Sequence, residues 1–482
     1  MAVDAPRTRS SARTLLPLAL ISLSTGLSTS VVLPFLALFL RTAVHAGPTR
    51  ITVFLVVTPL AGVLVATLLG RLSDRWPIRR KLLIGAALAG LLSSGLTAVI
   101  RDYWVLLGLA ATSTALAASL YPQTFAYARQ AVARHSPERA ALDASRIRTA
   151  FSLAWVAGPP LASVLLTAGG FPLVYAVAAA TYAGAAAVAT FLLAEIGVPG
   201  GGTGVGVAED GRGAAAAGPP AAAPPDAGAP PDAGAPPDAP APPDGADPAA
   251  VGGPPADGAA GPVGVSRRVL ASTVVAFTML QCPLTLGVQA LPLLIGEDLG
   301  GDPSRAGLIL GLCAALEIPA MLALGALTTR VPLRLLLAAG GACGVLYYAV
   351  ATVAPNIWVL GAAQVVNALF IAGVSALGIS YLQDMLPHQP GRATTLFTNT
   401  FPIGAVLAGP LWGLAAGFGY RSAFGMACAL CAGGLLLLLT TRPTNGGYRG
   451  PAKAPARAAT TASRAARSAN RVVAADRSST TS

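Results

Sequence analysis

Long apolar segments alternate with short polar loops along most of the chain. A membrane-spanning helix needs about 20 apolar residues, and segments of this kind fall into two sets of six. The first set lies near residues 14–40, 51–70, 82–100, 104–127, 149–168 and 172–194, and the second near 269–295, 306–327, 335–354, 357–380, 394–418 and 422–440. The pattern predicts an all-α integral membrane protein with twelve transmembrane helices in two six-helix halves, 14–194 and 269–440.

The rest of the chain forms three polar segments: an N-terminal tail (1–13), a linker (195–268) and a C-terminal tail (441–482). The linker repeats Pro-Pro-Asp-Ala-Gly-Ala. Proline removes backbone donors, and alanine and glycine bury little surface, so we expect a disordered tether. The basic C-terminal tail is expected to be disordered too. Both the linker and the two tails are predicted to be cytoplasmic.

Composition excludes a soluble protein, because 54% of the 482 residues are hydrophobic and only 11% are charged. The net charge of +12 does not indicate nucleic-acid binding, since the basic residues lie in short loops and tails between apolar segments. All five cysteines lie within apolar segments, where they are expected to pack rather than bind metal. The spans contain no nucleophile–base set, metal-ligand cluster or phosphate-binding glycine loop, so we expect neither an enzyme nor a cofactor.

The basic residues predict the orientation of the helices. If both termini are cytoplasmic, the loops on the opposite side carry only Arg41, Arg50, Arg101, Arg305 and Arg421, out of 32 basic residues in the chain. Cytoplasmic loops of membrane proteins are enriched in lysine and arginine. The sequence therefore predicts a multi-pass protein of the cytoplasmic membrane with both termini inside.

A charged loop, Gly70–Lys81, separates two apolar segments, and a related stretch recurs at Gly325–Arg334. A charged loop used twice indicates two equivalent halves that move against each other, as in a transporter. Asp74 can cap a facing helix or pair with an arginine in one conformation and lose this contact in another. We assign a gating role to Gly70, Asp74, Arg75, Arg79 and Arg80; the alternative is that these charges only set the topology. In the second copy Thr329 replaces the aspartate.

Two apolar segments contain a Gly-Pro pair at equivalent positions, Gly158-Pro159 and Gly409-Pro410. Glycine and proline within a spanning helix permit close helix packing and a kink. We therefore add these four residues to the gating set.

These motifs resemble the major facilitator superfamily. Gly70-x-Leu-Ser-Asp-Arg-x-Pro-x-Arg-Arg80 is similar to its signature between helices 2 and 3, although Trp76-Pro77 replaces the usual glycine. In that family the aspartate contacts the start of helix 11 and a nearby arginine. The Gly158-Pro159 motif resembles the helix 5 motif of its antiporters.

Longer stretches at 121–129, 148–160, 316–319, 381–387 and 393–400 closely resemble the bacterial sugar efflux transporters of this superfamily. The resemblance covers about 14–194 and 269–440. It implies the major facilitator fold and export of sugars or glycosides, with proton antiport as the coupling.

Glu317 is the acidic residue nearest the middle of any predicted span. A carboxylate costs several kcal/mol at that depth unless it is paired or faces water, so such residues mark functional sites. We predict that Glu317 is the proton-coupling group; the alternative is a structural hydrogen bond to a neighbouring helix.

An uncharged sugar calls for amide side chains that pair with hydroxyls and aromatic rings that cover the ring face. Gln281, Thr285 and Gln289 share one face of their helix because they follow a four-residue spacing. The predicted substrate-binding set also contains Gln364, Asn367, Asn399, Trp155, Tyr121 and Arg148. Each of these could instead hold helices together. For Arg148, the alternative is that its charge merely sets the topology.

The sequence thus predicts a secondary active exporter of sugars or glycosides that works as a monomer by alternating access around a midplane site. Its expected partners are a small-molecule sugar or glycoside, protons and the lipid bilayer, with no nucleic acid. A proton-coupled multidrug exporter is the nearest alternative. A non-transporting membrane sensor or scaffold, using the linker and basic tail, is the alternative from another class.

Overall fold

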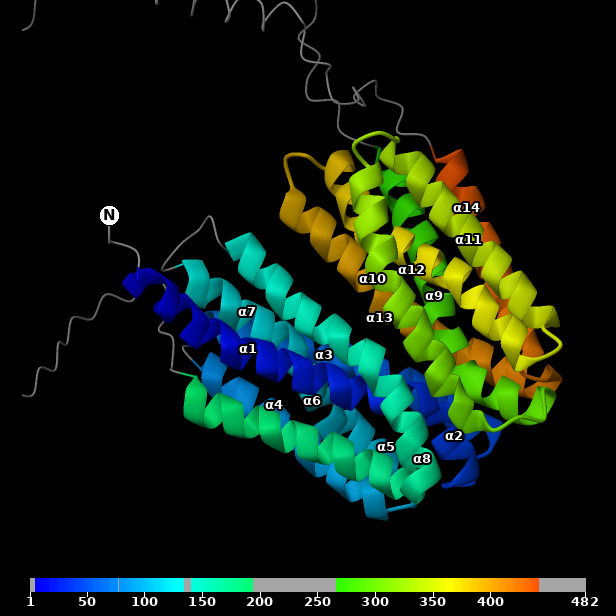
Figure 1. The fold of residues 1–482 in the computed structure, drawn as a ribbon, viewed down its shortest axis with the longest axis horizontal. Helices are drawn as coiled ribbons and strands as arrows, with labels where there is room; N and C mark the ends of the chain where they lie inside the picture. The colour runs from blue at the N-terminus through cyan, green and yellow to red at the C-terminus, as the bar shows by residue number, and fades with distance from the viewer. Residues whose placement is uncertain (1–4, 77, 134–139, 194–265, 442–482) are drawn as a thin grey trace, which may run out of the picture. The chain divides into compact units, whose positions relative to one another are not determined.

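The computed structural model describes residues 5–76, 78–133, 140–193 and 266–441 (Figure 1). Residues 1–4, 194–265 and 442–482 lie outside the described residues. They include almost all of the predicted linker and of the C-terminal tail, and what the sequence predicts for them stays a prediction. Within the described part the chain is helical and contains no strand.

The helices of the first half run from residue 5 to residue 192. They are α1 (Ala5–Val32), η1 (Leu33–Phe35), α2 (Leu36–Thr42), α3 (Pro48–Arg75), α4 (Arg79–Val99), α5 (Tyr103–Leu109), the π-helical η2 (Ala110–Thr114), α6 (Ala115–Ala118), α7 (Leu120–Ala133) and α8 (Ala140–Leu192). Four of them, α5, η2, α6 and α7, follow one another along the span predicted at 104–127.

The helices of the second half run from residue 267 to residue 440. They are α9 (Arg267–Leu293), the π-helical η4 (Leu294–Asp298), η5 (Pro303–Arg305), α10 (Ala306–Leu327), α11 (Leu333–Val353), α12 (Ile357–Met385), α13 (Pro390–Phe418) and α14 (Arg421–Thr440). Each of the six α-helices corresponds to one predicted span, and the bounds of α10 match the prediction.

In the described residues, eleven helices are long and apolar enough to cross a membrane, and one of these spans contains 47 residues. That span lies within α8, where Gly170 is non-helical, with φ 66° and ψ −160°. Ser28 of α1 lies 2.5 Å from Thr181 Oγ1, while Ser30, two residues on, donates to the carbonyl of Ala154 at 3.0 Å. In a straight helix residues 154 and 181 would stand about 40 Å apart. The chain therefore reverses at Gly170, between the spans predicted at 149–168 and 172–194, as Figure 1 shows for α8.

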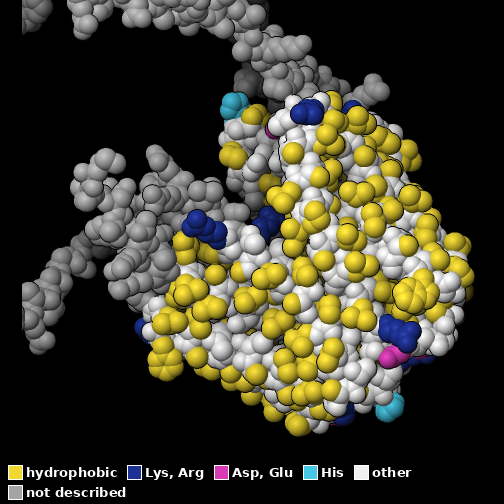
Figure 2. Space-filling view, in the orientation of Figure 1, with side chains coloured by type: hydrophobic (Ala, Val, Ile, Leu, Met, Phe, Trp, Pro, Cys, Tyr) yellow, Lys and Arg dark blue, Asp and Glu magenta, His cyan; other side chains and the backbone are white. Residues whose placement is uncertain are grey.

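The surface of the helices is apolar, as expected for side chains that face lipid. On the face that Figure 2 shows, hydrophobic side chains are widespread, and lysine and arginine lie near two opposite ends. Phe191, Trp358 and Phe418 are 82%, 82% and 83% exposed. Such exposure of large apolar side chains is unfavourable in water but not in a hydrocarbon medium. The chain is therefore a multi-pass membrane protein.

Candidate functional site

The two halves are joined by a cluster of polar side chains around Arg41, at the end of α2. The Arg41 guanidinium forms an ion pair with Glu297 of η4, with Nε 2.9 Å from Oε1 and Nη2 3.0 Å from Oε2. Its Nη1 donates a hydrogen bond to the Tyr420 hydroxyl, and its Cζ lies 5.3 Å from the centroid of the Tyr420 ring. One arginine of the first half thus holds two segments of the second half. We call this cluster, Arg41, Glu297 and Tyr420, the Arg41 cluster.

Helices α8 and α10 meet near the same end. The Ser163 hydroxyl donates to the carbonyl of Ser304 in η5. A Cβ added at Gly307 would overlap the carbonyl of Pro159, and one added at Gly311 would overlap the Pro160 ring. The Gly-Pro-Pro segment of α8 therefore packs directly against the backbone of α10, which requires glycine at both positions. Gly158 itself faces Ser30 of α1, within its own half.

Helices α3 and α13 form a second contact between the halves. A Cβ added at Gly409 would overlap Val56, and one added at Gly413 would overlap Thr52. The α8–α10 and α3–α13 contacts thus each use two glycines four residues apart on the second-half helix. We did not single out Gly307, Gly311 and Gly413 in the sequence, although the spacing of small residues is a known signal for helix packing.

At the opposite end of α3 lies the charged loop Gly70–Lys81. The Asp74 carboxylate accepts a hydrogen bond from Arg79 Nη2 at 2.7 Å, and its side chain is 72% exposed. Asp74 thus pairs with an arginine of its own loop. Gly70 has open space around it and Arg75 is exposed.

Arg80 and Arg334 have the same structural role in the two halves. Arg80 Nη2 donates to the carbonyl of Thr190, near the end of α8, at 2.5 Å. Arg334 Nη2 donates to the carbonyl of Leu439, near the end of α14, at 2.6 Å. Each guanidinium satisfies carbonyls that the end of a helix leaves without partners. The two halves therefore share this contact even though Thr329 replaces the aspartate in the second.

The amide side chains predicted to bind substrate lie in two groups within the second half. Gln281 of α9 is buried and donates to Thr400 of α13 at 3.0 Å. Gln364 and Asn367 of α12 are buried and bonded to each other at 2.9 Å. Gln289 is also buried, Thr285 is half-buried with a hydroxyl that lacks a partner, and Asn399 is exposed.

Gln364 and Asn367 connect three helices. Gln364 Nε2 donates to the Tyr347 hydroxyl of α11 at 3.2 Å, and Asn367 Nδ2 lies 3.4 Å from Cys313 Sγ of α10. Sequence reasoning missed Tyr347 and Cys313, because neither stands out from the apolar residues around it.

Glu317 of α10 is half-buried and interacts electrostatically with Arg148 of α8, in the other half. Arg148 also acts on Tyr121, whose ring centroid lies 4.2 Å from that of Phe151 and 4.8 Å from that of Phe125. Trp155 is half-buried, one turn beyond Phe151. The structure thus brings together the predicted residues Glu317, Arg148 and Tyr121, from both halves.

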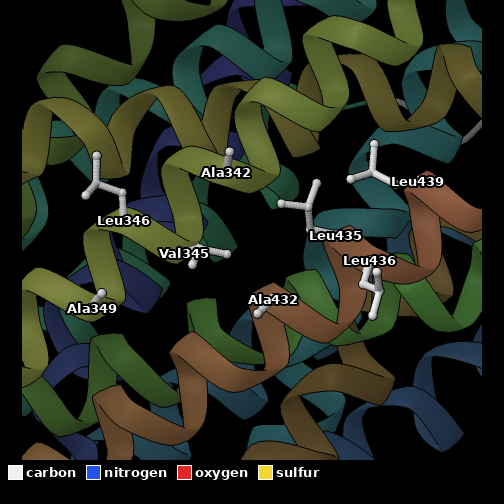
Figure 3. A pocket seen from close by; sticks show the side chains of 8 residues that line it. All are labelled: Ala342, Val345, Leu346, Ala349, Ala432, Leu435, Leu436 and Leu439. Carbon is white, nitrogen blue, oxygen red and sulfur yellow. The ribbon is translucent and has the colours of Figure 1, made fainter.

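Neither the pocket between α11 and α14 nor the cysteines form a site for a polar solute or a metal ion in the described part of the chain. The pocket in Figure 3 lies between α11 and α14 and is lined only by alanine, valine and leucine. The five cysteines are free, and no group of three or more His, Cys, Asp or Glu in the described part of the chain is arranged to hold a metal ion.

Comparisons with known proteins agree with this architecture. The family model described as Major Facilitator Superfamily matches residues 18–228 and 269–476. Sugar efflux transporter A of Dickeya chrysanthemi is 30% identical over 88% of this chain and 94% of that protein. Sugar efflux transporter B of Salmonella typhimurium is 28% identical over an alignment that covers 82% of this chain and 87% of that protein.

Solved structures show the same fold at low identity. The nucleoside transporter NupG has a TM-score of 0.65 at 12% identity, over 89% of this chain and 98% of that chain. A POT family transporter in complex with a peptide conjugate has a TM-score of 0.64 at 10% identity, over 89% of this chain and 95% of that chain. With two helical halves, the matching family model and relatives that align over nearly their whole length, this chain belongs to the sugar efflux transporter family of the Major Facilitator Superfamily.

Proposed function

We propose that this protein exports sugars or glycosides across the cytoplasmic membrane by alternating access, driven by the inward flow of protons. The observation that carries the choice of substrate is the similarity to proteins named sugar efflux transporters over 82–88% of the chain. The fold itself supports a transporter rather than an enzyme, and the transporter is expected to act as a monomer.

The distribution of arginine supports an orientation with both termini in the cytoplasm. The Arg41 cluster then lies at the external end and the Gly70–Lys81 loop at the cytoplasmic end. The ion pair and the close α8–α10 and α3–α13 contacts correspond to a state closed toward the outside. Breaking them, together with a new contact for Asp74 at the cytoplasmic end, produces the alternate state.

Glu317 supplies the proton-binding group in this mechanism. When ionised, its carboxylate attracts Arg148 in the other half, and a proton on the carboxyl removes this attraction. Proton binding therefore changes the relative energies of the two states, as antiport requires. The same region provides Tyr121 for the sugar ring face. Gln281, Thr285, Gln289, Gln364, Asn367 and Asn399, with Trp155, remain candidates for the contacts to hydroxyl groups.

Uptake into everted membrane vesicles tests the proposal. With the interior acidified, vesicles that contain the protein should accumulate a radiolabelled glycoside, and dissipating the pH gradient should stop accumulation. Uptake of lipophilic cations without any sugar would indicate a multidrug exporter instead. The absence of any solute flux, combined with partner binding that depends on the C-terminal tail, would support a sensor or scaffold.

A further inference from the structure

The orientation of the two amides on α12 is determined by a main-chain carbonyl. Gln364 Nε2 lies 3.1 Å from the carbonyl oxygen of Leu360 and 3.2 Å from the Tyr347 hydroxyl. A carbonyl oxygen can only accept a hydrogen bond, so the atom that faces it must be the NH₂ group of Gln364. Gln364 Oε1 is therefore the atom that faces Asn367.

This orientation determines that of Asn367 as well. An amide oxygen can only accept, so the Asn367 atom 2.9 Å from Gln364 Oε1 is Nδ2. The same Nδ2 lies 3.4 Å from Cys313 Sγ. Asn367 Oδ1 is left buried without a hydrogen-bond partner, in a residue that is only 6% exposed. A buried acceptor without a donor is unfavourable, so this atom favours any donor that reaches it.

Glu317 is the acidic side chain one turn from the contact between Cys313 and Asn367, and its carboxyl becomes a strong donor when it is protonated. Cys313 and Glu317 are four residues apart on α10 and so lie on one face, one turn apart. Helical side chains lean toward the N-terminus of their helix, which carries the Glu317 carboxyl back over the turn that bears Cys313. Cys313 Sγ contacts Asn367, and Glu317 acts electrostatically on Cys313.

We propose that Asn367 is a positioning residue for the proton carrier: its Oδ1 accepts a hydrogen bond from the Glu317 carboxyl when that carboxyl is protonated. This inference rests on the proposed role of Glu317 in proton coupling. An ionised carboxylate has no proton to donate and is repelled by Oδ1. It instead interacts with Arg148 of the first half. Glu317 therefore has one partner for each protonation state, Asn367 in its own half and Arg148 in the other.

Two groups interact with Glu317 directly, Cys313 and Arg148, and the others are reached through Cys313. Cys313 lies on α10 itself, Arg148 on α8, and Asn367 on α12, with Tyr347 of α11 reached through Gln364. Among these, Asn367 Oδ1 combines an unfilled acceptor with a fixed orientation. The neutral carboxyl is thus held within the second half while the transporter changes state.

Infrared difference spectroscopy of the purified transporter between acidic and alkaline buffer tests this inference. The C=O stretch of the protonated Glu317 carboxyl is the band that disappears in Glu317→Gln. In Asn367→Leu, which retains the branched shape of the side chain, this band should shift to higher wavenumber because the carboxyl has lost its acceptor. The matched control is Gln281→Leu, another buried amide of the same half that bonds to Thr400; there the band should not move.

The outcomes separate the two proposals. A carboxyl band that is lost in Glu317→Gln but unmoved in Asn367→Leu overturns the role of Asn367 and leaves the proton role of Glu317 intact. If Glu317→Gln removes no band, the proton role of Glu317 fails, and the inference fails with it. Should Asn367→Leu not fold, Gln364→Leu provides the second test. It frees the Asn367 amide to rotate, so the band should broaden and move upward, and an unchanged band contradicts the proposal.

Discussion

Arg41 and Glu297 are 256 residues apart in the chain, yet their side chains meet through two nitrogen–oxygen contacts at one end of the interface between the halves. Their side chains are 38% and 42% exposed. An ion pair with this exposure contributes on the order of 0.2–1 kcal/mol. The Tyr420 ring and hydroxyl add a further contact to the same guanidinium. This contact is strong enough to bias a conformational equilibrium and weak enough to break in the alternating-access cycle that we propose.

Reversing either charge should open the Arg41 end. In Arg41→Glu or Glu297→Arg, two like charges face each other, which we expect to destabilise the closed state by about 1 kcal/mol and to change the ratio of the two states about fivefold. Spin labels at His45 and Pro355, exposed residues of the two halves, report the change by double electron–electron resonance. The distance distribution should shift to longer values in either single variant.

The double variant Arg41→Glu with Glu297→Arg is the matched control, because it restores opposite charges at the same positions. Its distance distribution and transport rate should return toward those of the wild type. If the double variant behaves as the sum of the two single variants, the ion pair does not hold the halves together. Raising the salt concentration should also weaken the effect of each single variant, since exposed charges are screened.

Adding one methyl group at Gly311 should separate α8 from α10. The new Cβ would overlap the Pro160 ring, and such overpacking costs about 1–3 kcal/mol in the state that contains the contact. We expect Gly311→Ala to lengthen the His45–Pro355 distance and to reduce the transport rate. Gly361→Ala on α12 is the control, because that position has open space around it. Equal effects of the two substitutions would contradict a role for the α8–α10 contact.

The sequence predicted the helices well because membrane spans are set by local composition. The bounds of α10 agree with the prediction, and the non-helical Gly170 lies between two predicted spans. These signals are local, since they depend on runs of apolar residues and on the short breaks between them. The contact between Arg41 and Glu297 leaves no local signal, because the fold alone brings the two residues together. Each charge taken separately resembles an ordinary loop residue.

The candidate site was predictable in its residue types but not in its pairings. The four-residue spacing of Gln281, Thr285 and Gln289 places them on one face of a helix. It does not indicate that Gln281 bonds to Thr400 of α13. Likewise Cys313 is an ordinary cysteine of an apolar segment in the sequence, and only the structure shows that it contacts Asn367. Glu317 stood out as a candidate because an acidic residue near the middle of an apolar span can be seen in the sequence without knowledge of its partners.

The turn before α10 should lose stability in acid. The Asp302 carboxylate accepts hydrogen bonds from the side chain and backbone of Ser304, which hold its pKa below the usual value of 3.8. A carboxyl with a lowered pKa stabilises the folded state above its unfolded pKa, and this contribution is lost as pH falls through the folded pKa. Asp302→Ala should therefore lower the apparent unfolding temperature in detergent at neutral pH.

The difference between Asp302→Ala and the wild type should shrink as the pH falls below 3.8. The loss at neutral pH should be on the order of 0.5–1 kcal/mol, as for other capping residues. Asp302→Asn keeps an acceptor oxygen and should retain part of the stability at every pH. A difference that stays constant from neutral pH into acid would show that the carboxylate charge has no part in the turn.

Replacing Glu317 with glutamine should separate transport from its driving force. Glutamine retains the size and polarity of the side chain but cannot exchange a proton, so Glu317→Gln should abolish accumulation driven by a pH gradient. Exchange of labelled for unlabelled glycoside across the membrane needs no net proton movement and should continue. Asp384→Asn is the control, since Asp384 is an exposed carboxyl near the end of α12 in the same half.

The measurement is uptake into vesicles with and without a gradient. Accumulation by Glu317→Gln at the wild-type level would exclude Glu317 as the proton carrier, whereas loss of both accumulation and exchange would show that the side chain is needed for binding or for the conformational change itself.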